Sequence, residues 1–264
     1  MSAVGFIEAA GRRTLGGVAE AGYLFMLFAE SLYWLLVGPF IRQPVRLPNL
    51  FAEMMRIGAL AVPIVFLLSF ANGVIMAIQG IATLKEFDAE SQVVPGIAYS
   101  VTREFGVLIA AIVVAGRSGS AVAARIGSMQ LSQEIDALRV MGVEPVRYLV
   151  APILLATLTM LPVLTILADA AAMLGGGLYS SFVLHISLTT FFERAFEVLV
   201  PYDVVQGLIK SVVFGGLIAL IACSNGFSVV GGAEGLGRAT TRSVVLSIAA
   251  IVVADMIFTY FLTR

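Results

Sequence analysis

The chain has 264 residues, of which 59% are hydrophobic and 12% charged, and its mean hydropathy is +1.00. A composition this apolar, with apolar runs near twenty residues long, excludes an ordinary soluble domain and indicates a membrane protein. The formal net charge of −1 gives no basis for binding nucleic acid, and the single cysteine, Cys223, excludes an internal disulfide framework and a multi-cysteine metal site.

The N-terminal region, residues 1–50, precedes a predicted transmembrane domain over residues 51–264. Within it the run from Ala21 to Ile41, AGYLFMLFAESLYWLLVGPFI, is long enough to cross a bilayer and carries one charge, Glu30. The run also has aromatic residues throughout, including the sole tryptophan, and such residues favour the membrane–water interface. It therefore fits either an interfacial elbow helix or a sixth span.

Five later runs have the ~20 apolar residues that a helix needs to cross ~30 Å of hydrocarbon. They are Ile57–Leu84, Val93–Ala115, Val146–Leu178, Val204–Ser224 and Ser243–Leu262. The third is long enough to tilt, and Pro152 and Pro162 inside it favour a kink. Small residues such as Gly175–Gly177 allow close helix packing, within one chain or between two copies. The expected fold class is an all-α membrane protein.

Charges between the predicted spans set the expected orientation. Basic residues gather before the first span, after the second and before the fifth, whereas the alternate loops are acidic. The basic residues are Arg42, Arg46, Arg56, Arg117, Arg125, Arg139, Arg147, Arg238 and Arg242. Because arginine-rich loops stay in the cytoplasm, the N-terminus is expected inside and the C-terminus outside.

The sequence lacks the motifs of the common catalytic sites. The chain has two lysines, Lys85 and Lys210, and neither completes G-x-x-x-x-G-K-[ST], so a P-loop is absent. The one histidine, His185, falls in an outer loop without cysteine neighbours, which argues against a metal site or a Ser-His-Asp triad. The chain is expected to be no enzyme and to bind no cofactor itself, so energy for uphill transport would come from another subunit.

Besides Arg147, at the edge of the third span, five charged residues fall inside the predicted spans, where each costs at least ~2.5 kcal/mol if it faces lipid. They are Arg103, Glu104, Asp169, Lys210 and Asp255. Counting ~1.5 Å per residue, Arg103, Lys210 and Asp255 lie about 15, 9 and 11 Å from the outer ends of their spans, a similar depth. Lys210 and Asp255 are candidates for an ion pair. Arg103 and Glu104 point ~100° apart, so each needs its own partner or a polar cavity. Such a cavity would suit an amphiphile, with a cation for phosphate and apolar walls for acyl chains.

The polar segment SQEIDALRVMGVEP, Ser132–Pro145, lies between two of the most apolar runs. Ser132 is expected to be the N-cap, and Gly142 the C′ residue, of a short helix over about 132–142. Its apolar stripe consists of Ile135, Leu138 and Met141. Because a helix this short is marginal in water, the stripe must dock. It fits a cytoplasmic coupling helix that engages a separate ATPase, or a helix that rests on its own protein.

Several ordered motifs resemble those of the MlaE/YrbE family, the permeases of Mla-type ABC transporters of lipid. They are TREFGVLIAAIVVAGR, AGRSGSAVAARIGSMQLSQEIDALRVMGVEPVRYLVAP, LIKSVVFGGLIALIACSNGF, GLGRATTRSVV and VVADMIFTYF. The resemblance covers about residues 50–264. It implies five transmembrane helices, an N-terminal interfacial helix and a short coupling helix. It also implies a permease of the bacterial inner membrane that moves phospholipid or a similar lipid and contributes to outer-membrane lipid asymmetry.

The resemblance further implies partners and site residues. The partners would be a second copy of this chain, two cytoplasmic ABC ATPase subunits that hydrolyse ATP with Mg, a hexameric periplasmic MCE-domain protein and, as in some relatives, a STAS-domain subunit. The implied substrate-binding residues are Gln79, Arg103, Glu104, Lys210 and Asp255. The implied ATPase-coupling residues are Glu134, Asp136, Leu138, Arg139 and Met141. The exact lipid and the direction of transport stay open.

Two other classes of protein fit the sequence less well. An intramembrane enzyme acting on lipids would need a nucleophile or a metal cluster, which the residue inventory lacks. An ion-coupled secondary transporter could use Glu104, Asp169 and Asp255 as a proton relay, but inverted repeats are expected in that class and none is convincing here.

Overall fold

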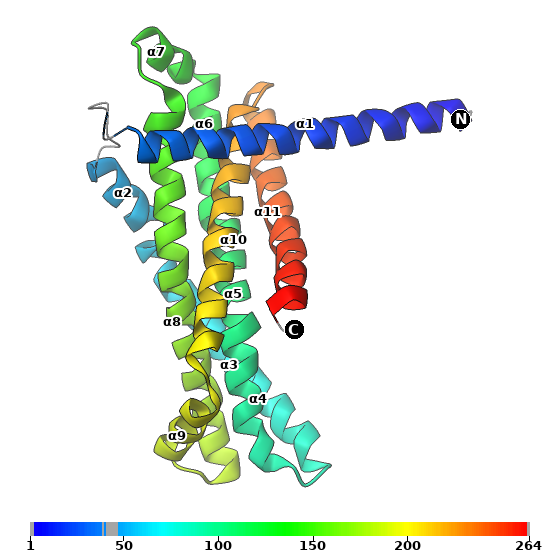
Figure 1. Ribbon diagram of the computed structural model, residues 1–264, viewed down its shortest axis with the longest axis vertical. Coiled ribbons are helices and arrows are strands. Elements are labelled where there is room, and N and C mark those ends of the chain that lie inside the picture. The colour runs from blue at the N-terminus through cyan, green and yellow to red at the C-terminus, as the bar shows by residue number, and fades with distance from the viewer. Residues whose placement is uncertain (1–2, 39, 41–46, 263–264) are drawn as a thin grey trace.

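The computed structural model describes residues 3–38, 40 and 47–262, with side chains from residue 15 onward, and its regular elements are all helices. Arg42 and Arg46, used above for the orientation, lie outside the described residues. Long, roughly aligned helices form a bundle, and α1 (Ala3–Leu36) crosses it near one end (Figure 1). The expected all-α membrane fold is confirmed.

Among the described residues, six helical stretches are long and apolar enough to cross a membrane. The first is Leu15–Leu36 within α1, and the others are Leu47–Lys85, Glu90–Leu131, Val146–Leu184, Pro201–Phe227 and Gly232–Leu262. These five contain the five predicted spans, each extended at one or both ends.

The extended stretches are built from several helices each. The first consists of α2 (Leu47–Ile57), η1 (Ala59–Ala61) and α3 (Val62–Lys85). The second consists of η2 (Glu90–Gln92), α4 (Val93–Ser100), η3 (Val101–Phe105), α5 (Gly106–Val114), η4 (Ala115–Gly119) and α6 (Ser120–Leu131). The last three are η5 (Val146–Val150) with α8 (Ala151–Leu184), then α10 (Pro201–Phe227) and α11 (Gly232–Leu262). Of these elements, η1 and η2 are 3₁₀ turns, whereas η3, η4 and η5 are π-helical turns.

Two stretches expected to be basic loops are helical instead. Arg117 lies in η4 and Arg125 in α6, whereas Arg238 and Arg242 lie in α11. The small residues of these stretches serve close packing: a Cβ on Gly127 would press against side chains of the α10–α11 connection and α11. The 42-residue helix Glu90–Leu131 is thus ~63 Å long, about twice the hydrocarbon thickness.

The orientation of α1 favours the interfacial helix over a sixth span. Figure 1 shows α1 lying across α6, α10 and α11 rather than along them. A helix that crosses the spanning helices runs along the membrane surface. Its contacts fix it there: the Arg147 guanidinium stands 5.2 Å from the centre of the Trp34 ring. Glu20 pairs with Arg242 of α11 at 2.7 Å, and Leu27 is buried in the main core.

Helices α3 and α8 pack with their backbones in contact. A Cβ on Gly73 of α3 would collide with the Ala172 carbonyl, and one on Gly175 of α8 would collide with the Phe70 carbonyl. The prediction that Gly175–Gly177 serves close packing is confirmed, and here the packing lies within one chain.

Both prolines of the third predicted span lie inside helical structure, and the kink expected there stays a prediction. Pro152 stands in the first turn of α8, directly after the π turn η5, so it lies where one kind of helical turn passes into another. The helix continues as one element through Pro162 to Leu184.

The predicted short helix is α7 (Glu134–Val140), which lies at the tip of the bundle beyond α1 (Figure 1). The prediction of Ser132 as its N-cap is wrong. Because α6 continues to Leu131, Ser132 ends that helix, and its Oγ donates to the Ser128 carbonyl at 2.9 Å. Gln133, with φ of 60°, takes the N-cap position and makes the sharp turn into α7.

The other end of α7 confirms the prediction for Gly142. Its φ is +72°, and its N–H donates to the Arg139 carbonyl at 3.0 Å. The next N–H, of Val143, donates to the Leu138 carbonyl at 2.9 Å. This pair of bonds is the Schellman motif, which a glycine at C′ favours.

The acidic stretch expected as an outer loop contains a helix, α9 (Leu188–Val198), at the opposite end of the bundle from α7 (Figure 1). Ser187 is its N-cap, with Oγ accepting from the Thr190 N–H at 3.1 Å. Phe191 and Ala195, four residues apart, are buried on its inner face. His185, in the connection before it, is exposed as expected.

Candidate functional site

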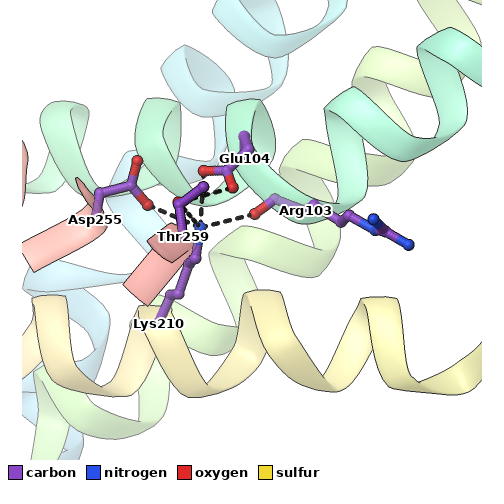
Figure 2. Close-up of polar contacts among 5 residues, drawn as sticks. All are labelled: Arg103, Glu104, Lys210, Asp255 and Thr259. Carbon is purple, nitrogen blue, oxygen red and sulfur yellow. Dashed lines mark hydrogen bonds and ion pairs between the residues drawn. The ribbon is translucent and has the colours of Figure 1, made fainter. Parts of the chain in front are cut away.

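Lys210 of α10 lies at the centre of a buried polar cluster (Figure 2). Its side chain is 0% exposed, and its Nζ lies 2.7 Å from Glu104 Oε2 and 2.9 Å from Asp255 Oδ1. Nζ also donates to Thr259 Oγ1 at 3.0 Å and to the Arg103 carbonyl at 3.2 Å. Three helical stretches are therefore joined through one ammonium group.

The ion pair expected between Lys210 and Asp255 is confirmed, and Glu104 adds a second carboxylate. The Thr259 hydroxyl donates to Glu104 Oε1 at 3.0 Å, so both Glu104 oxygens are engaged. Two carboxylates against one ammonium leave a formal charge of −1 when all three are ionised. Such a charge is stable inside a bundle only while the ammonium and the hydroxyl hold it.

Arg103 has its own partner, as its position next to Glu104 requires. Its Nε and Nη2 each lie 2.8 Å from Asp203 Oδ1, and its guanidinium carbon stands 4.5 Å from the centre of the Tyr99 ring. Figure 2 shows its side chain directed away from Lys210, although its carbonyl faces the cluster. The Arg103 side chain is 37% exposed, so this guanidinium presents charge at the edge of the cluster.

The π-helical turn η3 carries both Arg103 and Glu104. A π turn widens the helix by one residue and re-aims the side chains around it, which is why such turns are frequent at functional sites. Here it lets two adjacent residues serve two separate ion pairs, to Asp203 and to Lys210.

Not every predicted residue joins this cluster. Gln79 is exposed on α3 and has no hydrogen bond to another described residue. Asp169 of α8 places Oδ1, which has no hydrogen-bond partner among the described residues, against Gly106 of α5. Of the five residues with an expected substrate-binding role, four lie in or beside the cluster and Gln79 does not.

Two members of the site were missed in the sequence. Thr259 lies four residues after Asp255, and Asp203 lies seven residues before Lys210, so each pair shares one face of a helix. That spacing was the available signal. Asp203 was assigned to an outer loop, whereas it is buried in the first turn of α10.

Asp203 supports the site in two ways, and its variants separate them. Its Oδ2 accepts from the Val200 N–H at 3.0 Å, which caps α10, while its Oδ1 holds Arg103. Asp203→Asn keeps an oxygen for the cap and loses the charge, whereas Asp203→Ala loses both. We expect the melting temperature to fall in the order wild type, Asn, Ala, with the cap worth about 1 kcal/mol. Equal melting of both variants in a thermal scan of the purified protein would contradict this double role.

The described residues contain no group of three or more His, Cys, Asp or Glu side chains that could hold a metal ion. Glu104 and Asp255 are instead both committed to Lys210. The arrangement can hold and orient a charged headgroup at its exposed Arg103 edge, next to the apolar surfaces of the helices.

The predicted coupling residues on α7 divide into docked and free side chains. Ile135 is fully buried and Leu138 packs half-buried on the main core, so part of the stripe rests on its own protein. Met141 is 67% exposed and its neighbour Val140 is 89% exposed. These two form an apolar tip.

The charged residues of α7 are exposed around that tip. Asp136 pairs with Arg139 at 3.3 Å, and Glu134 Oε1 accepts from the Ser132 hydroxyl at 2.8 Å. Contacts this exposed contribute little to stability, which leaves the charged groups available to a partner.

The family described as Permease MlaE matches residues 50–261 of the chain. The chain belongs to the MlaE permease family. It is similar to the intermembrane phospholipid transport system permease protein MlaE of Haemophilus influenzae, with 33% identity over 261 residues and 97% of each chain covered. It is also 32% identical, over 94% of each chain, to a probable ABC transporter permease protein of Rickettsia prowazekii.

MlaE relatives extend beyond bacteria. The chloroplast protein TRIGALACTOSYLDIACYLGLYCEROL 1 of Arabidopsis thaliana is 36% identical over 213 residues, which cover 81% of this chain and 61% of that one. The matched residues 50–261 contain the Lys210 cluster and α7, but only the end of the N-terminal region. The chain is thus a multi-pass ABC transporter permease, and the division at residue 50 stays a prediction.

Proposed function

We propose that this chain is the transmembrane subunit of an inner-membrane ABC transporter that moves phospholipid, or a similar amphiphile, between that membrane and a periplasmic MCE protein. The supporting observation is that the Arg103 guanidinium lies at the edge of the buried Lys210 cluster, inside an MlaE-family bundle. A phosphate would bind Arg103, and the acyl chains would lie along the apolar helices. Such transport would contribute to outer-membrane lipid asymmetry.

The proposed assembly has two copies of this chain, two cytoplasmic ATPase subunits that bind and hydrolyse ATP with Mg, and a hexameric MCE-domain protein outside. A STAS-domain subunit is a further candidate partner. The N-terminus would be cytoplasmic, which puts α7 on the same side as the ATPases. This placement agrees with the arginines near the α7 end of the bundle.

Within the site, direct contact with lipid falls to the exposed members. Arg103 and Glu104 retain exposed surface, whereas Lys210 is fully buried and its donors are occupied by Glu104, Asp255, Thr259 and a carbonyl. Lys210 and Asp255 therefore position Glu104. Gln79 would contact lipid separately, on α3.

The ATPase partner would seat the tip of α7 in an apolar pocket. Val140 and Met141 are its exposed apolar residues, and Leu138 contributes less because it already packs on this chain. Glu134, Asp136 and Arg139 would fix the register through polar contacts. Motion of the ATPases would pass to the bundle through α7, which connects α6 to α8.

The double substitution Val140→Glu with Met141→Glu tests this docking. It should reduce co-purification of the ATPase subunit at least about ten-fold, because two charges would enter an apolar pocket. Phe196→Glu on α9 is the matched control, since Phe196 is also 67% exposed but lies at the opposite end of the bundle. Unchanged ATPase recovery with the α7 variant would refute the coupling role.

A further inference from the structure

A second charged cluster lies near the α7 end of the bundle, between α2 and α6. Glu53 of α2 is buried and forms a two-point pair with Arg125 of α6. The Arg125 Nη1 lies 2.8 Å from Glu53 Oε1, and its Nη2 donates to Oε2 at 2.9 Å. Arg56 adds a weaker contact to the same carboxylate at 3.4 Å. The pair fixes α2 against the bundle.

These residues line a cavity of about 380 Å³. Arg117 of the π turn η4 joins them there, and its Nη1 donates to the Arg56 carbonyl at 3.1 Å and to Ser118 Oγ at 3.4 Å. Ile57, Leu60 and Val122 supply apolar walls. A second cavity of about 280 Å³ shares Glu53, Arg56 and Arg125, so the guanidinium groups stand between two open spaces.

The charge of the larger cavity is unbalanced. Three guanidinium groups against one carboxylate leave a formal charge of +2 among its lining residues. Arg125 is committed to Glu53, whereas Arg56 and Arg117 keep donors that bond to no other residue in the described part of the chain. Two guanidinium groups beside one pocket are suited to a phosphate, which accepts paired N–H donors.

The location of the cavity favours a lipid over a soluble anion. The short helix α2 lies close to the level at which α1 crosses the bundle (Figure 1), and α1 is expected to run along the membrane surface. Leu60, an apolar residue that lines the cavity, is 58% exposed. A cationic pocket with an apolar edge at this depth meets lipid headgroups rather than bulk solvent.

We propose that the cavity lined by Arg56, Arg117 and Arg125 binds the phosphate of an anionic phospholipid, with an acyl chain lying past Leu60. This site is separate from the Lys210 cluster and does not rest on the proposed transport function. Arginines are common near the cytoplasmic side of any membrane protein, but these are held in place around one pocket. Glu53 holds the Arg125 side chain, and the Arg56 carbonyl holds that of Arg117.

The test counts lipid bound to the purified, delipidated full-length chain by native mass spectrometry. Phosphatidylglycerol would be titrated into detergent micelles, with phosphatidylcholine as the zwitterionic comparison. The variant Arg56→Gln/Arg117→Gln should bind phosphatidylglycerol about ten-fold more weakly and phosphatidylcholine unchanged. Arg125 is left intact, since its loss would strand the buried Glu53.

Arg194→Gln/Arg238→Gln is the matched control, because it removes the same charge from two exposed positions outside the cavity. A further variant, Arg117→Lys, keeps the charge and loses the planar fork, and should weaken binding by an intermediate factor. Equal binding by the cavity variant and the control would overturn the proposal. So would displacement of the lipid by millimolar inorganic phosphate, which would assign the pocket to a free anion.

Discussion

Lys210→Met is expected to lower the melting temperature of the purified protein by about 5–10 °C and to abolish lipid transport. The substitution removes the ammonium that holds Glu104 and Asp255 at 2.7 and 2.9 Å, and leaves two carboxylates inside the bundle without a cation. Breaking a buried ion pair from one side typically costs about 3–5 kcal/mol. Thermal unfolding in detergent, followed by size-exclusion chromatography, would measure it.

The chain supplies its own control for this experiment. Lys85 is the other lysine, and it is exposed at the end of α3, so Lys85→Met should leave the melting temperature unchanged. The triple variant Lys210→Met/Glu104→Gln/Asp255→Asn removes the stranded charges and should recover most of the stability without recovering transport. If Lys210→Met had the same melting temperature as Lys85→Met, the cluster would have no role in holding the helices together.

Gly73→Ala is expected to reduce the yield of folded protein severely, because a single methyl group would collide with the Ala172 carbonyl of α8. Backbone atoms cannot rotate away as a side chain can, so α3 and α8 must separate, at a cost of about 3 kcal/mol or more. The fraction of monodisperse protein after detergent extraction gives the readout.

Gly80→Ala on the same helix is the matched comparison. The added Cβ would meet only Val93 Cγ1, at 3.9 Å, which is ordinary van der Waals contact. Helix propensity then favours alanine by up to ~1 kcal/mol, so this variant should be as stable as the wild type or slightly more. Similar yields for the two variants would show that the α3–α8 contact is looser than the structure has it.

The ionic cluster was largely predictable, because the membrane makes an unpaired charge costly. Lys210 and Asp255 were expected to pair because they lie at similar depths in their spans. Arg103 and Glu104 were expected to have separate partners because their side chains point in different directions. The identity of those partners was not predictable, since it depends on the π turn η3, which no residue pattern marked. Gln79 was placed at the site by resemblance alone, and it lies elsewhere on α3.

Helix boundaries were harder to predict than the helices themselves. Around Arg117 and Arg125, and again before Ser243, the clustered arginines indicated loops. Both stretches are helical, and their small residues suit packing between membrane helices. The short helix α9 was overlooked because its stretch was interpreted by charge, although Phe191 and Ala195 have helical spacing. At α7 the pattern identified the helix, and only the tight turn after α6 displaced the N-cap from Ser132 to Gln133.

The most direct measurement is transfer of a headgroup-labelled phospholipid out of proteoliposomes that contain this chain with its ATPase subunit and MCE acceptor. Transfer should require ATP hydrolysis, stop when the ATPase subunit is omitted, and fall sharply in Glu104→Gln. Transfer by this chain alone, driven by a proton gradient in the absence of nucleotide, would contradict a permease powered through α7 and would favour an ion-coupled transporter.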